Sequence, residues 1–147
     1  MRLNSDLREF LALLNSRGVD YVIVGAYSLA FHGRPRYTGD LDILVRGTDD
    51  NASKLVNLLN DFGFAESVFK MSHFTEPGQV IQLGGPPNRI DLLTSISGVS
   101  NDEALADKMP VELDGVPIFV LSKDTLIRNK RAVGRPQDLA DIEGLDA

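Results

Sequence analysis

Three aspartates in two short apolar runs are the residues of this chain best suited to chemistry. Asp40 and Asp42 are separated by one leucine at the start of the run DLDILV. On a strand, residues two apart point to the same face, so these carboxylates emerge together. Two like charges side by side destabilise a strand unless a hard cation such as Mg²⁺ compensates them. We therefore expect the pair to hold a metal ion. In the alternative, Asp40 caps a turn and Asp42 lies exposed on an edge strand.

A third carboxylate, Asp91, lies inside a second apolar run, RIDLL. An aspartate in the middle of an apolar strand is costly unless it is paired or bound to metal. If this strand runs beside the one that carries Asp40 and Asp42, the three carboxylates converge. A site for two metal ions about 3.5–4 Å apart needs that geometry, and Mg²⁺ is the expected ion, with Mn²⁺ as a substitute. The alternative for Asp91 is a salt bridge to Arg89.

The aspartates need a frame of strands and helices, and the sequence alternates patterns of both kinds. Gly25 follows the apolar stretch 21–24 and turns it into a short helix, whose first backbone N–H groups suit phosphate oxygens. Asp114-Gly115 is a strong hairpin signal. The expected helices cover about 7–14, 25–33, 48–63, 102–108 and 122–132, with a last one from Pro136. The expected strands cover 21–24, 40–45, about 64–70, 79–83, 89–94, 111–113 and 116–120.

These patterns predict the α/β (α+β) class, with a mixed β-sheet flanked by helices. At 147 residues and 43% hydrophobic content, the chain is expected to form one domain over residues 1–147. The absence of cysteine excludes disulfides and thiolate metal sites. No apolar run approaches the roughly 20 residues of a membrane span, and no signal-peptide pattern begins the chain, so a cytoplasmic location is expected. The net charge of −6 argues against broad non-specific binding of nucleic acid.

In its motifs the chain resembles the nucleotidyltransferases of the DNA polymerase beta-like superfamily. That signature combines a glycine turn, an Asp-apolar-Asp motif and a later single acid on a strand. Here the three parts read Val24-Gly25-Ala26, Asp40-Leu41-Asp42 and Ile90-Asp91-Leu92. The fuller string, with His32-Gly33, Arg36 and Thr38, is similar to a small bacterial branch. That branch includes toxin nucleotidyltransferases of abortive-infection systems and antibiotic nucleotidyltransferases.

The resemblance implies the nucleotidyltransferase core fold and a Mg²⁺-dependent transfer of a nucleoside monophosphate. The donor would be a nucleoside triphosphate such as ATP, and the acceptor a hydroxyl group on a small molecule, an RNA or a protein. Asp40, Asp42 and Asp91 take the catalytic and metal-binding roles. The residues that the resemblance assigns to nucleotide binding are Gly25, Ala26, Ser28, Arg36 and Lys130. Because little of the chain lies outside the core fold, a partner protein or a second copy could complete the acceptor site.

Two further interpretations follow from the same residues. The family usually has glycine or serine where this chain has Ala26, which offers only its backbone N–H to a phosphate. A catalytically degenerate domain that binds nucleotide or a partner is therefore one alternative, and a component of a toxin–antitoxin pair is another. Lys130 has a solvated surface lysine as its alternative. Asp138 and Asp141 are expected to balance nearby basic residues. His32 is expected to be structural, and His73 to lie in a loop.

Overall fold

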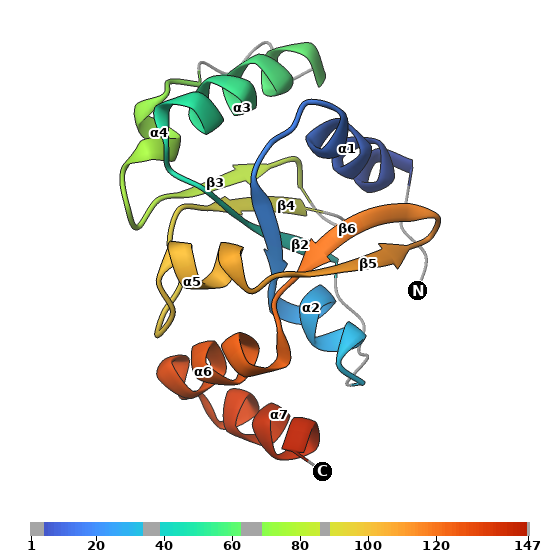
Figure 1. Cartoon of the computed structure of the whole chain (residues 1–147), viewed down its shortest axis with the longest axis vertical. Coiled ribbons are helices and arrows are strands. Elements are labelled where there is room, and N and C mark those ends of the chain that lie inside the picture. The colour runs from blue at the N-terminus through green and yellow to red at the C-terminus, as the bar shows by residue number, and fades with distance from the viewer. Residues whose placement is uncertain (1–4, 34–38, 63–68, 86–88, 147) are drawn as a thin grey trace.

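The computed structural model describes residues 5–33, 39–62, 69–85 and 89–146, which form a six-stranded mixed sheet with helices on both faces (Figure 1). The strand order across the sheet is β3-β4-β2-β1-β6-β5. Strand β1 pairs antiparallel with β2 and parallel with β6, and β2 pairs parallel with β4. The bounds are β1 Tyr21–Val24, β2 Asp40–Val45, β3 Val80–Leu83, β4 Arg89–Leu93, β5 Met109–Leu113 and β6 Val116–Val120.

Helices pack on the sheet in two groups, which Figure 1 shows on opposite sides of the strands. The first group packs over the face that carries Ile23 and Ile43, and comprises α1 Ser5–Ser16, α3 Asp49–Phe62 and α4 Ser72–Thr75. The second group covers the face that carries Val22 and Leu44, and comprises α5 Asn101–Ala106, α6 Lys123–Val133 and α7 Pro136–Asp146. Helix α2, Gly25–Phe31, follows β1 directly and packs on both β1 and β2. Apolar residues on both faces explain why the strands read as nearly continuous apolar runs.

Local sequence signals set several of the element ends. Ser122 accepts a hydrogen bond from the backbone N–H of Thr125 at the start of α6, and Gly134 ends that helix with φ of 70°. Asp114 and Gly115 both have positive φ, 50° and 81°, as a tight two-residue hairpin requires. Because these signals depend on neighbours in the chain, the sequence predicts them directly.

The predicted class, a mixed sheet flanked by helices, is confirmed, and two local predictions need comment. The strand expected near 64–70 lies mostly outside the described residues, and its described end, Phe69 and Lys70, is not in a strand. His73 lies in α4, so the loop expected there is wrong. Phe74 is fully buried beside it and anchors this single turn in the core. Among the described residues, no helix is long and apolar enough to cross a membrane.

Candidate active site

Strands β2 and β4 run side by side in the same direction and bring the predicted acids together. Asp42 lies directly opposite Asp91, and Asp40 lies opposite Arg89. Because alternate strand residues share a face, all four side chains project from the face that also carries Leu44. Asp91 is buried, whereas Asp40 and Asp42 are half-buried. The condition under which the sequence analysis expects the three carboxylates to converge, that the Asp91 strand runs beside the Asp40–Asp42 strand, is therefore met.

Gly25 closes the site from the side of β1. Strand β1 pairs with β2 so that Val24 lies opposite Asp42, and Gly25 follows with φ of 67°. A Cβ atom at position 25 would lie only 2.6 Å from Oδ2 of Asp42. Such a contact is far inside van der Waals distance, so only glycine lets the turn approach the carboxylate. The glycine that the sequence singles out is required by both its backbone angle and this close approach.

Arg89 binds two of the three aspartates. Its Nε donates to Oδ1 of Asp91 at 2.8 Å, and its Nη2 donates to Oδ2 of the same carboxylate at 3.1 Å. The same Nη2 also donates to Oδ2 of Asp40 at 3.1 Å. The salt bridge considered for Asp91 is thus present, and it extends to Asp40. Sequence spacing gave no sign of this second contact, because it depends on the β2–β4 register.

The site still carries surplus negative charge around Asp42. Burial raises the pKa of Asp42 to about 6, and the neighbouring carboxylates of Asp91 and Asp40 add to the increase. Arg89 acts in the opposite direction but does not offset these effects. A carboxylate held this way gains from any nearby cation, because a positive charge stabilises its ionised form.

The donor atoms suit a hard divalent cation, since they are carboxylate oxygens with too little positive charge around them. Within residues 5–33, 39–62, 69–85 and 89–146, however, no three His, Cys, Asp or Glu side chains are already arranged to hold an ion. Arg89 instead bridges Asp40 and Asp91. The residues present therefore fit a metal ion in their chemistry, and Arg89 must move if all three carboxylates are to be ligands.

Helix α2 places the glycine turn and Ser28 in different surroundings. Its N-cap residue, Val24, has no polar side chain, so side-chain capping leaves the first backbone N–H groups of the helix available. Gly25 and Ala26 are half-buried at this end. Ser28 is fully buried, and its hydroxyl has no hydrogen-bond partner in the described part of the chain. Ser28, which the resemblance assigns to nucleotide binding, therefore lies in the interior and not at the surface of this turn.

Lys130 is buried in α6 and paired with α7. Its Nζ lies 3.1 Å from Oδ2 of Asp141 and 3.4 Å from Oδ1 of Asp138. Arg135 also binds Asp138, through Nε at 2.7 Å. The expectation that Asp138 and Asp141 balance the basic residues and hold the last helix is confirmed. The solvated lysine considered as the alternative for Lys130 is wrong, because only 7% of this side chain is exposed.

The remaining candidates from the sequence have simpler outcomes. Arg36 lies outside the described residues. His32 follows α2, and its Nε2 is 2.7 Å from the backbone oxygen of Leu121, which ties the helix to the end of β6. The structural role expected for His32 is confirmed. His73 accepts a hydrogen bond from the backbone N–H of Lys70 through Nδ1, which supports the single turn of α4.

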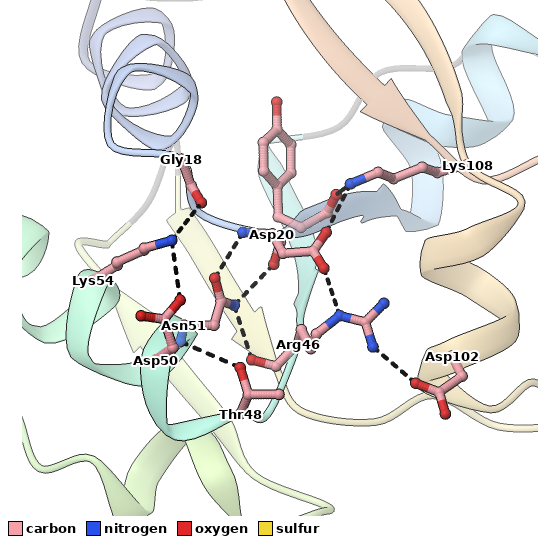
Figure 2. Close-up of polar contacts among 10 residues, drawn as sticks. Gly18, Asp20, Arg46, Thr48, Asp50, Asn51, Lys54, Asp102 and Lys108 are labelled. Atoms are coloured by element: carbon pink, nitrogen blue, oxygen red, sulfur yellow. Dashed lines mark hydrogen bonds and ion pairs between the residues drawn. The ribbon is translucent and has the colours of Figure 1, made fainter.

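A second polar cluster, at the opposite end of β1 and β2, was not predicted (Figure 2). Asp20 binds Arg46 at 2.5 Å and Lys108 at 2.8 Å, and these bonds lower the pKa of Asp20 against the effect of burial. Asn51 bonds the backbone of Asp20 and of Arg46 and so fixes α3 to both strand ends. These residues are scattered over the chain, from the loop between α1 and β1 to the residue before β5, so no local spacing could have revealed them.

An open hollow of about 480 Å³ adjoins this second cluster. Its walls come from the end of α1 and the β5–β6 hairpin, and it lies away from the three aspartates. The lining residues are Asn15, Gly18, Val19, Asp20, Pro110, Pro117, Ile118 and Phe119.

Solved structures share this fold. A protein from Thermotoga maritima classed as a nucleotidyltransferase (TM1012) superposes with a TM-score of 0.63 at 21% identity, over 94% of this chain and 88% of its own. The lincosamide antibiotic adenylyltransferase LnuA, solved with lincomycin bound, gives 0.62 at 16% identity, over 99% and 98%. ANT(2″)-Ia, solved with adenylyl-2″-tobramycin, gives 0.55 at 14% identity, over 95% and 84%. At these identities the likeness establishes the fold.

The family follows from the sequence itself. A comparison with curated protein sequences found no significant match. A model of one protein family, however, matches residues 3–147 and so includes both strands of the acidic site. Its members are described as nucleotidyl transferases, in agreement with the glycine turn and the acids on β2 and β4. The chain belongs to the family "Nucleotidyl transferase of unknown function" (DUF2204) and is an enzyme of the nucleotidyltransferase class.

Proposed function

We propose that this enzyme transfers a nucleoside monophosphate from a nucleoside triphosphate to a hydroxyl group of a small molecule, with a divalent metal ion as cofactor. The observation that carries the proposal is the register that sets Asp42 opposite Asp91, with Gly25 against Asp42. Enzymes that transfer phosphoryl groups work mainly by positioning and charge neutralisation, and divalent cations share in both. Mg²⁺ held by Asp40, Asp42 and Asp91 would supply that positive charge.

The chain's own residues divide the remaining work. The half-buried turn at Gly25 and Ala26 offers backbone N–H groups to the phosphates of the donor. Asp91 is the most buried of the three acids, and it accepts the proton of the acceptor hydroxyl at an oxygen that Arg89 has released, as the acceptor oxygen attacks the α-phosphorus. One P–O bond forms to the acceptor, the bond to the β-phosphate oxygen breaks, and pyrophosphate leaves. Arg36 and Lys130 are assigned to the phosphates by family resemblance alone, and Lys130 would have to leave Asp138 and Asp141 to reach them.

Two observations favour a small acceptor over RNA. The net charge of −6 disfavours contact with a polyanion. LnuA, whose structure contains lincomycin, matches this chain over nearly the full length of both proteins, which favours a small acceptor for a chain of this extent. LnuA is an adenylyltransferase, and ANT(2″)-Ia was solved with an adenylylated antibiotic, so ATP is the first donor to test.

The test is transfer of label from triphosphates carrying ³²P at the α-phosphate. ATP, CTP, GTP and UTP would each be offered with Mg²⁺ and a panel of hydroxylated small molecules, with transfer RNA as the competing acceptor class. Transfer to a small molecule that Asp42→Asn abolishes and Glu112→Gln preserves supports the proposal, because Glu112 is an exposed acid on the edge strand β5. Transfer to RNA alone would refute the acceptor class. Transfer that persists in Asp42→Asn would refute the site.

A further inference from the structure

Arg89 lies among the acids that the proposed function assigns to the metal ion. Two of its nitrogens bond both oxygens of Asp91, at 2.8 and 3.1 Å, and one of them also bonds Asp40 at 3.1 Å. A fork-to-carboxylate contact of this kind is among the stronger and more directional ion pairs. It differs from an ordinary surface salt bridge, because one guanidinium joins carboxylates from two neighbouring strands.

The strand register places both partners of this contact on one face of the sheet. Arg89 and Asp91 are two residues apart on β4, so their side chains share the face on which Asp40 and Asp42 project from β2. Only 10% of the Asp91 side chain and 31% of the Arg89 side chain are exposed. Asp91 is therefore buried, whereas Arg89 is half-buried. Water weakens charge interactions less at a buried carboxylate than at the surface.

A divalent ion and the Arg89 guanidinium compete for the same oxygens. The two positive charges repel each other, and both oxygens of Asp91 already accept bonds from Arg89. The side chain of Asp40 is 46% exposed, and its Oδ2 accepts a bond of 3.1 Å from Arg89. Asp40 and Asp42 are consequently more accessible to an ion from solvent than Asp91, which is buried and bound by Arg89.

We propose that Arg89 is the resident counter-cation of this site: it holds Asp91 and Asp40 in the metal-free enzyme, and Asp91 becomes a metal ligand only when Arg89 releases it. This inference rests on the proposed function. Arg89 is thereby a positioning residue that acts through the carboxylates. It makes the metal-free site less negative and more stable, and it weakens the binding of free divalent ions.

The test measures binding of Mn²⁺ to the metal-free protein, without nucleotide and without turnover. Calorimetric titration of Arg89→Met should show affinity at least about threefold tighter than wild type, because the competing cation is gone. Without metal, the thermal midpoint of Arg89→Met should be lower than that of wild type. Saturating Mn²⁺ should raise the midpoint of Arg89→Met by more than it raises that of wild type. Arg89→Lys keeps one charge but lacks the fork, so its affinity should fall between the two.

Arg128→Met is the matched control, since Arg128 also pairs with one carboxylate, Glu103 at 2.6 Å, but lies on α6 away from the acids. Its Mn²⁺ affinity should equal that of wild type. Unchanged or weaker binding by Arg89→Met would overturn the inference. If circular dichroism shows that Arg89→Met does not fold, Arg89→Lys decides: tighter binding than wild type supports the inference, and equal or weaker binding overturns it.

The same titration separates this inference from the proposed function. Mn²⁺ binding that Asp42→Asn abolishes but Arg89→Met leaves unchanged would overturn only the role of Arg89. Absence of Mn²⁺ binding by wild type and by both Arg89 variants, even with a triphosphate present, would overturn the proposed metal site as well. Binding of Mn²⁺ by Arg89→Met and not by wild type would be the strongest support for Arg89 as a cation that competes with the metal.

Discussion

Gly25 and Asp42 are so close that a Cβ atom at position 25 would lie 2.6 Å from the Oδ2 atom of the carboxylate. The backbone of Gly25 also has φ of 67°, which disfavours any other residue. The turn that follows β1 thus lies directly against an acid of β2. The contact links the glycine turn to the acids, and it gives the first prediction.

Gly25→Ala should lower the free energy of unfolding and abolish label transfer. The positive φ alone costs about 1–2 kcal/mol, and the overlap with Asp42 adds to that cost. Gly78→Ala separates the two effects, because Gly78 has a similar φ of 76° but open space around its Cβ position. Urea denaturation should show the larger loss for Gly25→Ala. Equal losses for the two variants would mean that the turn tolerates the overlap.

Asp42→Asn should stabilise the metal-free protein at neutral pH while it removes activity. The pKa of Asp42 is raised to about 6, so the folded protein keeps this proton while the unfolded chain, near pKa 3.8, has lost it. Stability therefore falls as pH rises from about 4 to about 6. Asparagine removes that loss, which we put at about 1–2 kcal/mol after allowing for partial exposure.

The check is urea denaturation in a metal chelator at pH 4 and pH 7. The gain from Asp42→Asn should be small at pH 4 and full at pH 7, whereas Glu112→Gln should change little at either pH. A gain of the same size at both pH values would show that the charge of Asp42 is not its source.

Affinity for Mn²⁺ should rise about tenfold between pH 5 and pH 7. With a pKa of about 6, roughly a tenth of Asp42 is ionised at pH 5 and most of it at pH 7, and a metal binds the ionised form. Calorimetry across this range measures the change. A flat profile would indicate that Asp42 does not bind the metal, and Asp42→Asn provides the comparison without the titrating group.

Lys130→Met should lower the free energy of unfolding by about 3 kcal/mol, because it leaves Asp138 and Asp141 buried with less compensating charge. The double variant Lys130→Met/Asp141→Leu should recover part of that loss, since it removes one uncompensated carboxylate. Urea denaturation of both variants tests this pairing. No recovery in the double variant would argue against Asp141 as the principal partner of Lys130.

The sequence predicted the parts of the site that local patterns determine. Alternation along a strand was enough to place Asp40 and Asp42 on one face, and Gly25 was recognisable as a turn. The sequence did not show that Arg89 reaches Asp40, because this contact arises only when β4 lies beside β2. Which strands lie side by side in the sheet depends on the packing of the whole chain.

Burial was harder to predict than strand position. Lys130 lies in a run of charged residues, and a solvated surface position was one of its two interpretations, yet α7 covers it with two carboxylates. The single turn α4 was missed because four residues are too few for a helical repeat, and buried Phe74 stabilises it through the core. In both cases the deciding interactions come from other elements.

The most direct test of the proposed site is a crystal structure of the enzyme with Mn²⁺ and a triphosphate analogue that cannot be cleaved between its α- and β-phosphates. Anomalous scattering from manganese marks the ion without ambiguity. We predict manganese at Asp40, Asp42 and Asp91, with Arg89 turned away from Asp91 and the phosphates against the turn at Gly25. Manganese and nucleotide bound elsewhere, for instance in the hollow beside Asp20, would contradict this prediction.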